Sequence, residues 1–283
     1  MNFTMYAGFA DMVKKEGLER AAEYAAKLGF SSVEVFSNCM VEGDLAFPDV
    51  ESAGKAREVL ARYGLTVSCY SAYMSAWQNE ESVQRAMKMV EIASALGSPY
   101  FHHTLLTWLE LPEEAPGFEE GISAALLVAE RIANHAKKFG ITCLYEDQGH
   151  YVNGVEGFGI FFCEMKKRCE NVGVCGDFGN IMFENERPED FLKAYVQDIR
   201  HVHVKDYLWK EADTSPGLNW IRANGNNWLK ETMVGYGDIN IKACMKVLLE
   251  AGYKGAYALE LGHSEPFESG VAQAMECLKR MAC

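Results

Sequence analysis

The sequence lacks the features that mark several broad classes of protein. It has nine cysteines, an odd number, and no two of them form a CxxC pair. This spacing indicates reduced thiols in a cytosolic protein. No stretch reaches the ~20 apolar residues that a membrane span requires, and no basic segment followed by a long apolar run opens the chain. We therefore expect a cytoplasmic protein without a membrane partner.

Basic residues are also scarce. The chain has 27 Lys and Arg against 40 Asp and Glu, a formal net charge of −13, and no cluster of basic residues. Such a surface repels a phosphate backbone, so a nucleic-acid partner is not expected. A glycine-rich phosphate cradle is not evident either. The expected partner is a small-molecule carbohydrate, and the sequence leaves open whether the protein forms a homo-oligomer.

Length and composition fit one large globular domain. Apolar residues make up 49% of the 283 residues and charged residues 24%, which is ordinary for a chain with a sizeable core. No linker or shift in composition divides the chain. This length is normal for a (β/α)8 barrel, so a single domain over residues 1–283 is the simplest prediction.

Strand-like runs alternate with helical segments along the whole chain. Several helical segments end in glycine, which suits a position of positive φ, at Gly29, Gly64, Gly97, Gly140 and Gly252. The expected strands are 3–9, 32–37, 65–71, 100–105, 141–146, 172–177, 200–206 and 256–261. The expected helices are 11–28, 50–62, 80–96, 118–139, 188–197, 239–251 and 267–281. Such alternation implies parallel pairing through right-handed crossovers, hence a (β/α)8 TIM barrel.

One long insertion interrupts this rhythm. Residues 207–235 are rich in Asn, Gly and Trp and show no clear periodicity. Irregular segments of that length in a compact domain are usually functional. We predict that this segment is irregular and acts as a lid over the site.

Four consecutive strands end on polar residues that suit a metal ion. Glu146, Asp177 and Glu260 close three of these strands, and His203 lies near the end of the fourth. The carboxyl ends of barrel strands meet on one rim, where TIM-barrel enzymes have their active sites. Three carboxylates and one imidazole are a ligand set for a divalent cation, so the four residues are predicted to bind one metal ion.

Other polar and aromatic residues near the strand ends are candidates for substrate binding. Lys205 either binds a substrate oxygen or pairs with a neighbouring carboxylate. Of His102 and His103, strand alternation sends one into the barrel, where it either binds a substrate hydroxyl or is a hydrogen-bonded core residue. Trp108 either forms an apolar wall against a sugar or packs in a loop. Asn180, three residues after Asp177, completes the substrate-binding candidates.

Some polar residues are expected to have structural roles. Glu34 is expected to pair with a Lys or Arg rather than to reach the pocket, and His201 to be buried two residues deeper than His203. Strand phase places Tyr145 outward. His150 and His263 either support the metal-binding residues or are surface loop residues.

The pattern resembles a known family. Glu146, Asp177, Lys205-Asp206 after His203, Gly235-Tyr-Gly-Asp238, and Gly252-Tyr-Lys-Gly255 leading to Glu260 are similar to the xylose isomerase-like barrel superfamily of sugar phosphate isomerases and epimerases. The resemblance implies that the two glutamates act in proton transfer as well as in metal binding. The chain departs from ketose 3-epimerases, which tend to carry His where this chain has Asn180. Lys205 fits the His-x-Lys-Asp form of several isomerase and dehydratase members.

The predicted activity follows from this site. We expect a divalent-metal-dependent isomerase or epimerase of a small keto-sugar or hydroxy-keto acid, with Glu146 and Glu260 as catalytic residues and a metal-stabilised enediolate. The alternative is a dehydratase, a lyase acting on a keto-inositol or related polyol through the same enolate. Carboxylate ligands favour Mn or Mg, while one imidazole also admits Co or Zn.

Overall fold

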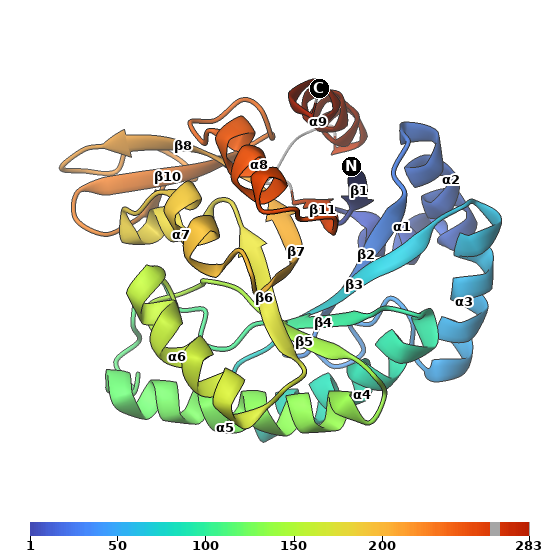
Figure 1. The fold of residues 1–283 in the computed structure, drawn as a ribbon, viewed down its shortest axis with the longest axis horizontal. Helices are drawn as coiled ribbons and strands as arrows, with labels where there is room; N and C mark the ends of the chain where they lie inside the picture. The colour runs from blue at the N-terminus through green and yellow to red at the C-terminus, as the bar shows by residue number, and fades with distance from the viewer. Residues whose placement is uncertain (261–266, 283) are drawn as a thin grey trace.

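The computed structural model describes residues 1–260 and 267–282, and its centre is a closed barrel of parallel strands (Figure 1). Each strand forms hydrogen bonds with its two neighbours around the barrel. In order around the barrel the strands are β1 (Asn2–Met5), β11 (Ala256–Leu259), β7 (Ile199–Val204), β6 (Val172–Asp177), β5 (Thr142–Tyr145), β4 (Tyr100–His103), β3 (Thr66–Tyr73) and β2 (Ser32–Asn38). The predicted (β/α)8 TIM barrel is confirmed.

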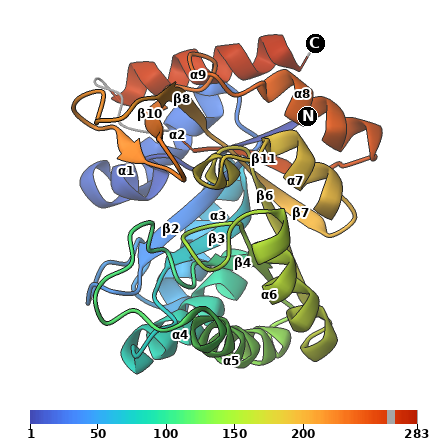
Figure 2. The same ribbon diagram turned by 90° about the vertical axis from the view of Figure 1, so that its left-hand side faces the viewer.

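Helices cover the outside of the barrel (Figures 1 and 2). They are α1 (Phe9–Glu16), α2 (Leu18–Leu28), α3 (Val50–Arg62), α4 (Glu80–Leu96), α5 (Phe118–Lys137), α6 (Val155–Arg168), α7 (Pro188–Tyr195), α8 (Ile241–Glu250) and α9 (Phe267–Met281), with a short 3-10 helix η1 (Asn180–Glu184) after β6. The predicted glycines end their helices at positive φ, with values of 85°, 72°, 78°, 70° and 80° at Gly29, Gly64, Gly97, Gly140 and Gly252.

The structure differs from two of the helix predictions. The segment predicted as one helix over 11–28 is two helices, because Gly17 adopts φ 90°, outside helical geometry. The prediction also lacked α6. Gly157 and Gly159 within α6 weaken its helical pattern, yet Phe158, Phe161 and Phe162 form a buried apolar stripe.

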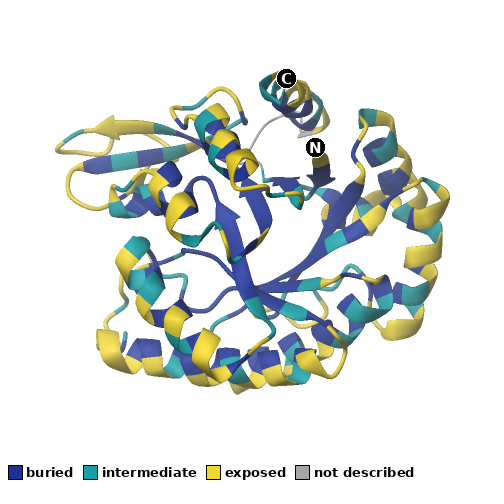
Figure 3. Ribbon diagram, in the orientation of Figure 1, coloured by how far each residue is buried: buried dark blue, intermediate teal, exposed yellow. Residues whose placement is uncertain are grey.

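The core lies mainly between the strands and the surrounding helices. The strands are buried almost throughout, whereas the helices bury one face and expose the other (Figure 3). Inside the barrel, a small apolar group of Cys69, Leu144 and Cys175 lies among polar side chains. No helix within the described ranges has both the length and the apolar character that crossing a membrane requires.

The segment predicted to be irregular forms a three-stranded antiparallel sheet, so that expectation was wrong. It comprises β8 (Asp206–Glu211), β9 (Ile221–Arg222) and β10 (Asn227–Thr232), with β10 in the middle, and projects from the side of the barrel in Figure 1. Only Lys205 separates β8 from barrel strand β7. Tyr207–Trp209 of β8 pairs with residues 229–231 of β10, and the aromatic residues Tyr207, Trp209 and Trp228 favour strands.

The base of this sheet is closed by one carboxylate. Asp206 Oδ2 accepts hydrogen bonds from the N–H groups of Gly235 and Gly237, both at 2.9 Å, and Oδ1 accepts one from Ile239 N–H at 3.2 Å. A Cβ atom on Gly237 would lie 2.1 Å from Asp206 Oδ1, so only glycine fits there. The start and the end of the insertion are therefore held together beside the barrel.

Candidate metal centre and active site

The four predicted metal-binding residues lie together at the carboxyl ends of their strands. Glu146 and Glu260 directly follow β5 and β11, Asp177 ends β6, and His203 is the penultimate residue of β7. Asp177, His203 and Glu146 are buried, and Glu260 is partly buried. Parallel strands of a closed barrel end on one rim, which explains why residues so far apart in sequence meet.

His203 Nδ1 is the atom on which these side chains converge. It lies 3.2 Å from Glu146 Oε2 and 3.2 Å from Glu260 Oε2. Asp177, His203 and Glu260 offer one ligand atom each within 4.8 Å of one another, and so do His102, Glu146 and His203. The structure thus brings the predicted quartet together and adds His102 to it.

Asp177 and Glu146 are both buried, yet the pKa values of their carboxyl groups shift in opposite directions. Burial, together with the charges of Glu260 and Glu146, raises the pKa of Asp177 to about 6 although Lys205 opposes this. Burial also disfavours the charge of Glu146, but the rings of His102 and His203 outweigh it and lower the pKa to about 2. Asp177 Oδ1 accepts hydrogen bonds from the N–H groups of Gly179 and Asn180, both at 2.7 Å, which fixes the carboxylate.

Lys205 is buried among the carboxylates. Its Nζ lies 3.2 Å from Asp177 Oδ2 and 3.0 Å from Glu260 Oε1, and it donates a hydrogen bond to Asn180 Oδ1 at 3.1 Å. Burial lowers the pKa of this amine, but the charges of Asp177 and Glu260 outweigh burial and raise it well above its usual value. Of the two roles weighed for Lys205, the structure shows the pairing with carboxylates; a role in substrate binding stays a prediction.

The two neighbouring histidines of β4 point in different directions. His102 faces the cluster, with Nε2 3.5 Å from Glu146 Oε1, and burial lowers the pKa of its ring. His103 faces away: its Nδ1 lies 3.1 Å from the Thr104 carbonyl oxygen and its ring packs edge-on against Tyr145. Burial lowers the pKa of His103 to about 4. The structure therefore brings His102, but not His103, to the strand-end residues.

The remaining predicted site residues are less central. Trp108 packs edge-on against Tyr151, with ring centroids 6.2 Å apart, and makes no described contact with the quartet. His150 is exposed and lines a groove of about 480 Å³ together with Glu184 and Arg222. His263 lies outside the described residues.

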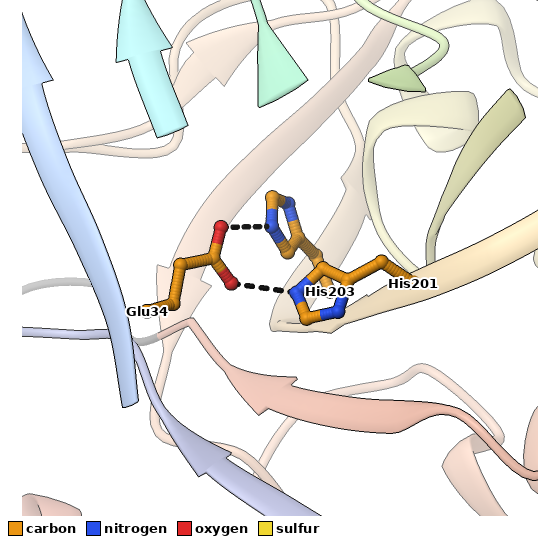
Figure 4. A group of neighbouring side chains, drawn as sticks. All are labelled: Glu34, His201 and His203. Carbon is orange, nitrogen blue, oxygen red and sulfur yellow. Dashed lines mark hydrogen bonds and ion pairs between the residues drawn. The ribbon is translucent and has the colours of Figure 1, made fainter. Parts of the chain in front are cut away.

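Glu34 was expected to pair with a Lys or Arg, and this was wrong. Its carboxylate is fully buried and pairs with two histidine rings (Figure 4): Oε2 lies 2.6 Å from His201 Nε2, and Oε1 lies 3.1 Å from His203 Nε2. Ser71 Oγ donates a third hydrogen bond to Oε1 at 2.5 Å. Burial opposes the charge of Glu34, but the charges and hydrogen bonds of His203 and His201 hold its pKa well below the usual range.

Sequence reasoning missed two further residues near the site. The ring of Tyr6, which directly follows β1, stacks on the His203 ring at 4.9 Å. Asp147 is fully buried, and neither of its carboxyl oxygens has a hydrogen-bond partner in the described part of the chain. Burial and the charges of Asp177 and Glu146 raise the pKa of Asp147 well above its usual value. Both residues follow the carboxyl end of a barrel strand, and this position in the sequence could have identified them as residues of the active-site rim.

The donor set fits a divalent cation. Three carboxylates and an imidazole converge, and the single ammonium group of Lys205 balances only part of their negative charge. Within residues 1–260 and 267–282, Asp177 Oδ2 and Glu260 Oε2 are buried atoms without a hydrogen-bond partner. Carboxylate oxygen and imidazole nitrogen are ligands for Mg, Mn, Co or Zn.

Comparison with known proteins agrees with this architecture. Residues 22–281 match a family described as xylose isomerase-like TIM barrels. The chain belongs to the xylose isomerase-like TIM barrel family. The family resemblance expected from the sequence is thereby confirmed, and the family's known relatives can be compared with this chain.

Three known proteins are similar to this chain, one in sequence and two in fold. An inosose dehydratase from Clostridium perfringens (strain 13 / Type A) is 23% identical over 95% of this chain and 90% of its own. The structure of a D-psicose 3-epimerase with D-tagatose from Clostridium cellulolyticum H10 aligns with a TM-score of 0.76 at 13% identity, over 99% of both chains. An IOLI protein with a bound zinc atom aligns with a TM-score of 0.73 at 18% identity, over all of this chain and 96% of that one.

Proposed function

We propose that this protein is a divalent-metal-dependent isomerase or epimerase of a small keto-sugar or hydroxy-keto acid. The observation that carries the proposal is the approach of Glu146 and Glu260, from strands on different sides of His203, to within 3.2 Å of the same ring nitrogen. Two carboxylates beside one cation-binding atom provide two groups that can exchange protons with a bound substrate. The epimerase among the structural relatives supports this choice.

Glu146, Asp177, His203 and Glu260 are the residues that would hold the cation. When bound, a divalent cation supplies Lewis acidity, which makes the C–H next to a substrate carbonyl more acidic. Glu146 and Glu260 are then the candidates to remove this proton and to return one. Return to the opposite face of the same carbon gives epimerisation, and return to the adjacent carbon gives aldose–ketose isomerisation.

The other buried side chains hold these groups in place. Lys205 pairs with both Asp177 and Glu260, so it limits their motion and balances part of their charge. His102 lies beside Glu146, where it can bind a substrate hydroxyl. Burial of His102, His203 and Asp177 keeps water away from the reacting carbon and strengthens each electrostatic contact.

Dehydration is a second candidate function. It is favoured by the Lys205 ammonium group 3.0 Å from Glu260, because this pair can deliver a proton to a departing β-hydroxyl group. The inosose dehydratase relative, which spans nearly the whole chain, supports the same alternative. The enolate formed by proton removal is common to both reactions, so the product separates them.

Proton exchange in deuterated water tests the proposal. NMR spectra are recorded for a panel of ketoses, hydroxypyruvate and inososes with Mn²⁺ added and then removed by chelation, for the wild type, Glu146→Gln and Glu260→Gln. We expect exchange in the wild type that depends on metal and is lost in both variants. A new sugar as product identifies an isomerase or epimerase, and an unsaturated ketone identifies a dehydratase. Absence of exchange from the metal-bound wild type with every compound would contradict the proposal.

A further inference from the structure

The Glu34 carboxylate is the centre of a buried hydrogen-bond network behind the metal-binding residues. It accepts from three partners: Ser71, His201 and His203 (Figure 4). An ionised carboxylate has only acceptor atoms, so each of these partners has to supply the proton. Ser71 therefore directs its O–H at Glu34, and both histidines direct an Nε2–H at it.

For His203 this arrangement decides which nitrogen can bind a metal ion. His203 Nε2 donates its proton to Glu34, and in the metal-free protein Nδ1 donates a second one to Glu146 at 3.2 Å, with Glu260 Oε2 at the same distance. A cation bound by these carboxylates would replace the proton on Nδ1, whereas Glu34 keeps the proton on Nε2. Glu34 thus reserves Nδ1 of His203 for the metal ion.

The same network reaches His102 through Ser71. The single proton of the Ser71 hydroxyl is used on Glu34, so Oγ can only accept from His102 Nδ1, 3.0 Å away. A neutral His102 then carries its proton on Nδ1 and has a lone pair on Nε2. That nitrogen faces the site 3.5 Å from Glu146 Oε1 and has no hydrogen-bond partner in the described residues.

We propose that Glu34 is a positioning residue that fixes the protons of two histidines, His203 directly and His102 through Ser71. In this arrangement, His203 Nδ1 faces the cation and His102 Nε2 accepts a hydrogen bond from a substrate hydroxyl. The inference rests on the proposed function, because it takes the cation to bind His203. Carboxylates commonly orient metal-binding histidines in this way.

His201 keeps Glu34 in position. Its Nε2–H occupies Glu34 Oε2 at 2.6 Å, while His203 and Ser71 occupy Oε1. With both oxygens engaged, the carboxylate cannot rotate without breaking a hydrogen bond in a buried setting. His201 therefore fixes the orientation in which Glu34 meets His203.

The proton positions can be observed directly. Long-range ¹H–¹⁵N NMR spectra of the Zn²⁺-loaded wild-type protein distinguish protonated, unprotonated and metal-bound ring nitrogens, with assignments from single histidine variants. We expect a proton on Nε2 of His203 with zinc on Nδ1, and a proton on Nδ1 of His102. Zinc on Nε2 of His203, or a proton on Nε2 of His102, overturns the inference.

Three variants test the parts of the network separately. Calorimetric titration measures their affinity for Zn²⁺, and the same NMR spectra show which ring nitrogens are protonated. Glu34→Gln keeps the shape but adds a donor, and we expect about 10–100-fold weaker zinc binding with mixed ring protonation. Ser71→Ala should leave zinc binding close to that of the wild type and change only His102. Thr4→Val removes an equally buried hydroxyl that contacts Ser32, and should change neither property.

The outcomes distinguish this inference from the proposed function. Glu34→Gln with wild-type zinc affinity and ring protonation overturns the positioning role even if the enzyme exchanges substrate protons. If Glu34→Gln does not fold, the Ser71→Ala variant provides the test. Unchanged ring protonation of His102 in that variant overturns the inference. Expected ring protonation without any substrate exchange contradicts the proposed function and leaves the positioning role intact. A wild type that binds neither Zn²⁺ nor Mn²⁺ overturns both.

Discussion

The carboxylate of Glu34 and the carboxylates at the strand ends lie close together in this barrel, but two of the latter differ from Glu34 in hydrogen bonding and in the direction of their pKa shift. Both oxygens of Glu34 are hydrogen-bonded, by two histidines and a serine, and its pKa is held well below the usual range. At the strand ends, the pKa values of Asp177 and Asp147 are raised, and buried carboxyl oxygens there have no hydrogen-bond partner among the described residues.

The difference shows which buried negative charge is fully paired by other groups of the protein. A buried charge is tolerated when it is paired and hydrogen-bonded, as that of Glu34 is. The strand-end residues Glu146, Asp177 and Glu260 share the single charge of Lys205 and the ring of His203. The charge of Glu34 is therefore paired within the fold, whereas the strand-end carboxylates have the composition expected of the proposed cation site.

Changing the catalytic candidates should have the largest effect on activity. We expect Glu146→Gln or Glu260→Gln to lower substrate proton exchange about 10²–10⁴-fold, the range typical of a lost general base. Each change also removes a partner of a buried group, His203 for Glu146 and Lys205 for Glu260, so the melting temperature of the metal-free variants should fall. Exchange rates by NMR and calorimetric melting curves measure the two effects.

Glu164→Gln, on the outer surface of α6, is the matched control for these variants. It is the same chemical change at an exposed residue, and it should preserve proton exchange. A catalytic-residue variant that exchanges protons as fast as this control would remove the corresponding glutamate from the mechanism.

Removal of the buried ammonium group should have the largest effect on stability. Lys205→Met leaves Asp177 and Glu260 without their ammonium partner. Breaking a buried ion pair costs about 3–5 kcal/mol in the free energy of unfolding. Urea denaturation measures this loss in the metal-free protein. Lys166→Met, which breaks the exposed pair with Asp198, should cost about 0–1 kcal/mol. Equal losses in the two variants would mean that burial does not distinguish the two pairs.

Metal binding should stabilise the strand-end group of carboxylates. With Mn²⁺ at 100 times its dissociation constant, the free energy of unfolding should rise by about 2.7 kcal/mol and return to its starting value after chelation. Calorimetric melting curves with and without Mn²⁺ measure the difference. Asp177→Asn should abolish most of the gain. A gain that survives in this variant would place the metal ion elsewhere.

A change far from Glu34 and from the strand-end carboxylates should have the smallest effect. Asp49 caps α3 by accepting a hydrogen bond from Ser52 N–H at 2.7 Å, so Asp49→Ala should lower the free energy of unfolding by about 1 kcal/mol. Its affinity for Zn²⁺, measured by calorimetry, should equal that of the wild type. Weaker zinc binding would show that the site depends on the stability of the whole barrel.

Much of the fold and part of the site could be predicted from the sequence. Strand alternation and helix-ending glycines determine the barrel, and the residues at strand ends meet because parallel strands share a rim. The convergence of Glu146, Asp177, His203 and Glu260 was predicted in this way, and their roles stay predictions. α6 was missed because Gly157 and Gly159 interrupt the pattern that its buried phenylalanines establish.

The network around Glu34 could not be predicted from the sequence. Its partner His201 is 167 residues away, and no local pattern reports which side chains face each other across a barrel. A carboxylate between valines in a buried strand needs a partner, and the inward residues of β7 are imidazoles rather than Lys or Arg. The pairing of Lys205 also depended on distances that only the structure provides.

Asp206 bears on how the sequence of this protein could be altered. Because it binds backbone N–H groups of residues 235, 237 and 239, the polypeptide leaves the barrel and returns to it at nearly the same point. The sheet between these points also contacts η1, because Asn224 N–H donates to the Phe183 carbonyl oxygen at 2.9 Å and the Tyr207 ring packs against Phe183. We therefore expect changes at the outer ends of the strands to leave Lys205 in place, and changes at Tyr207 or Asn224 to disturb the residues after Asp177.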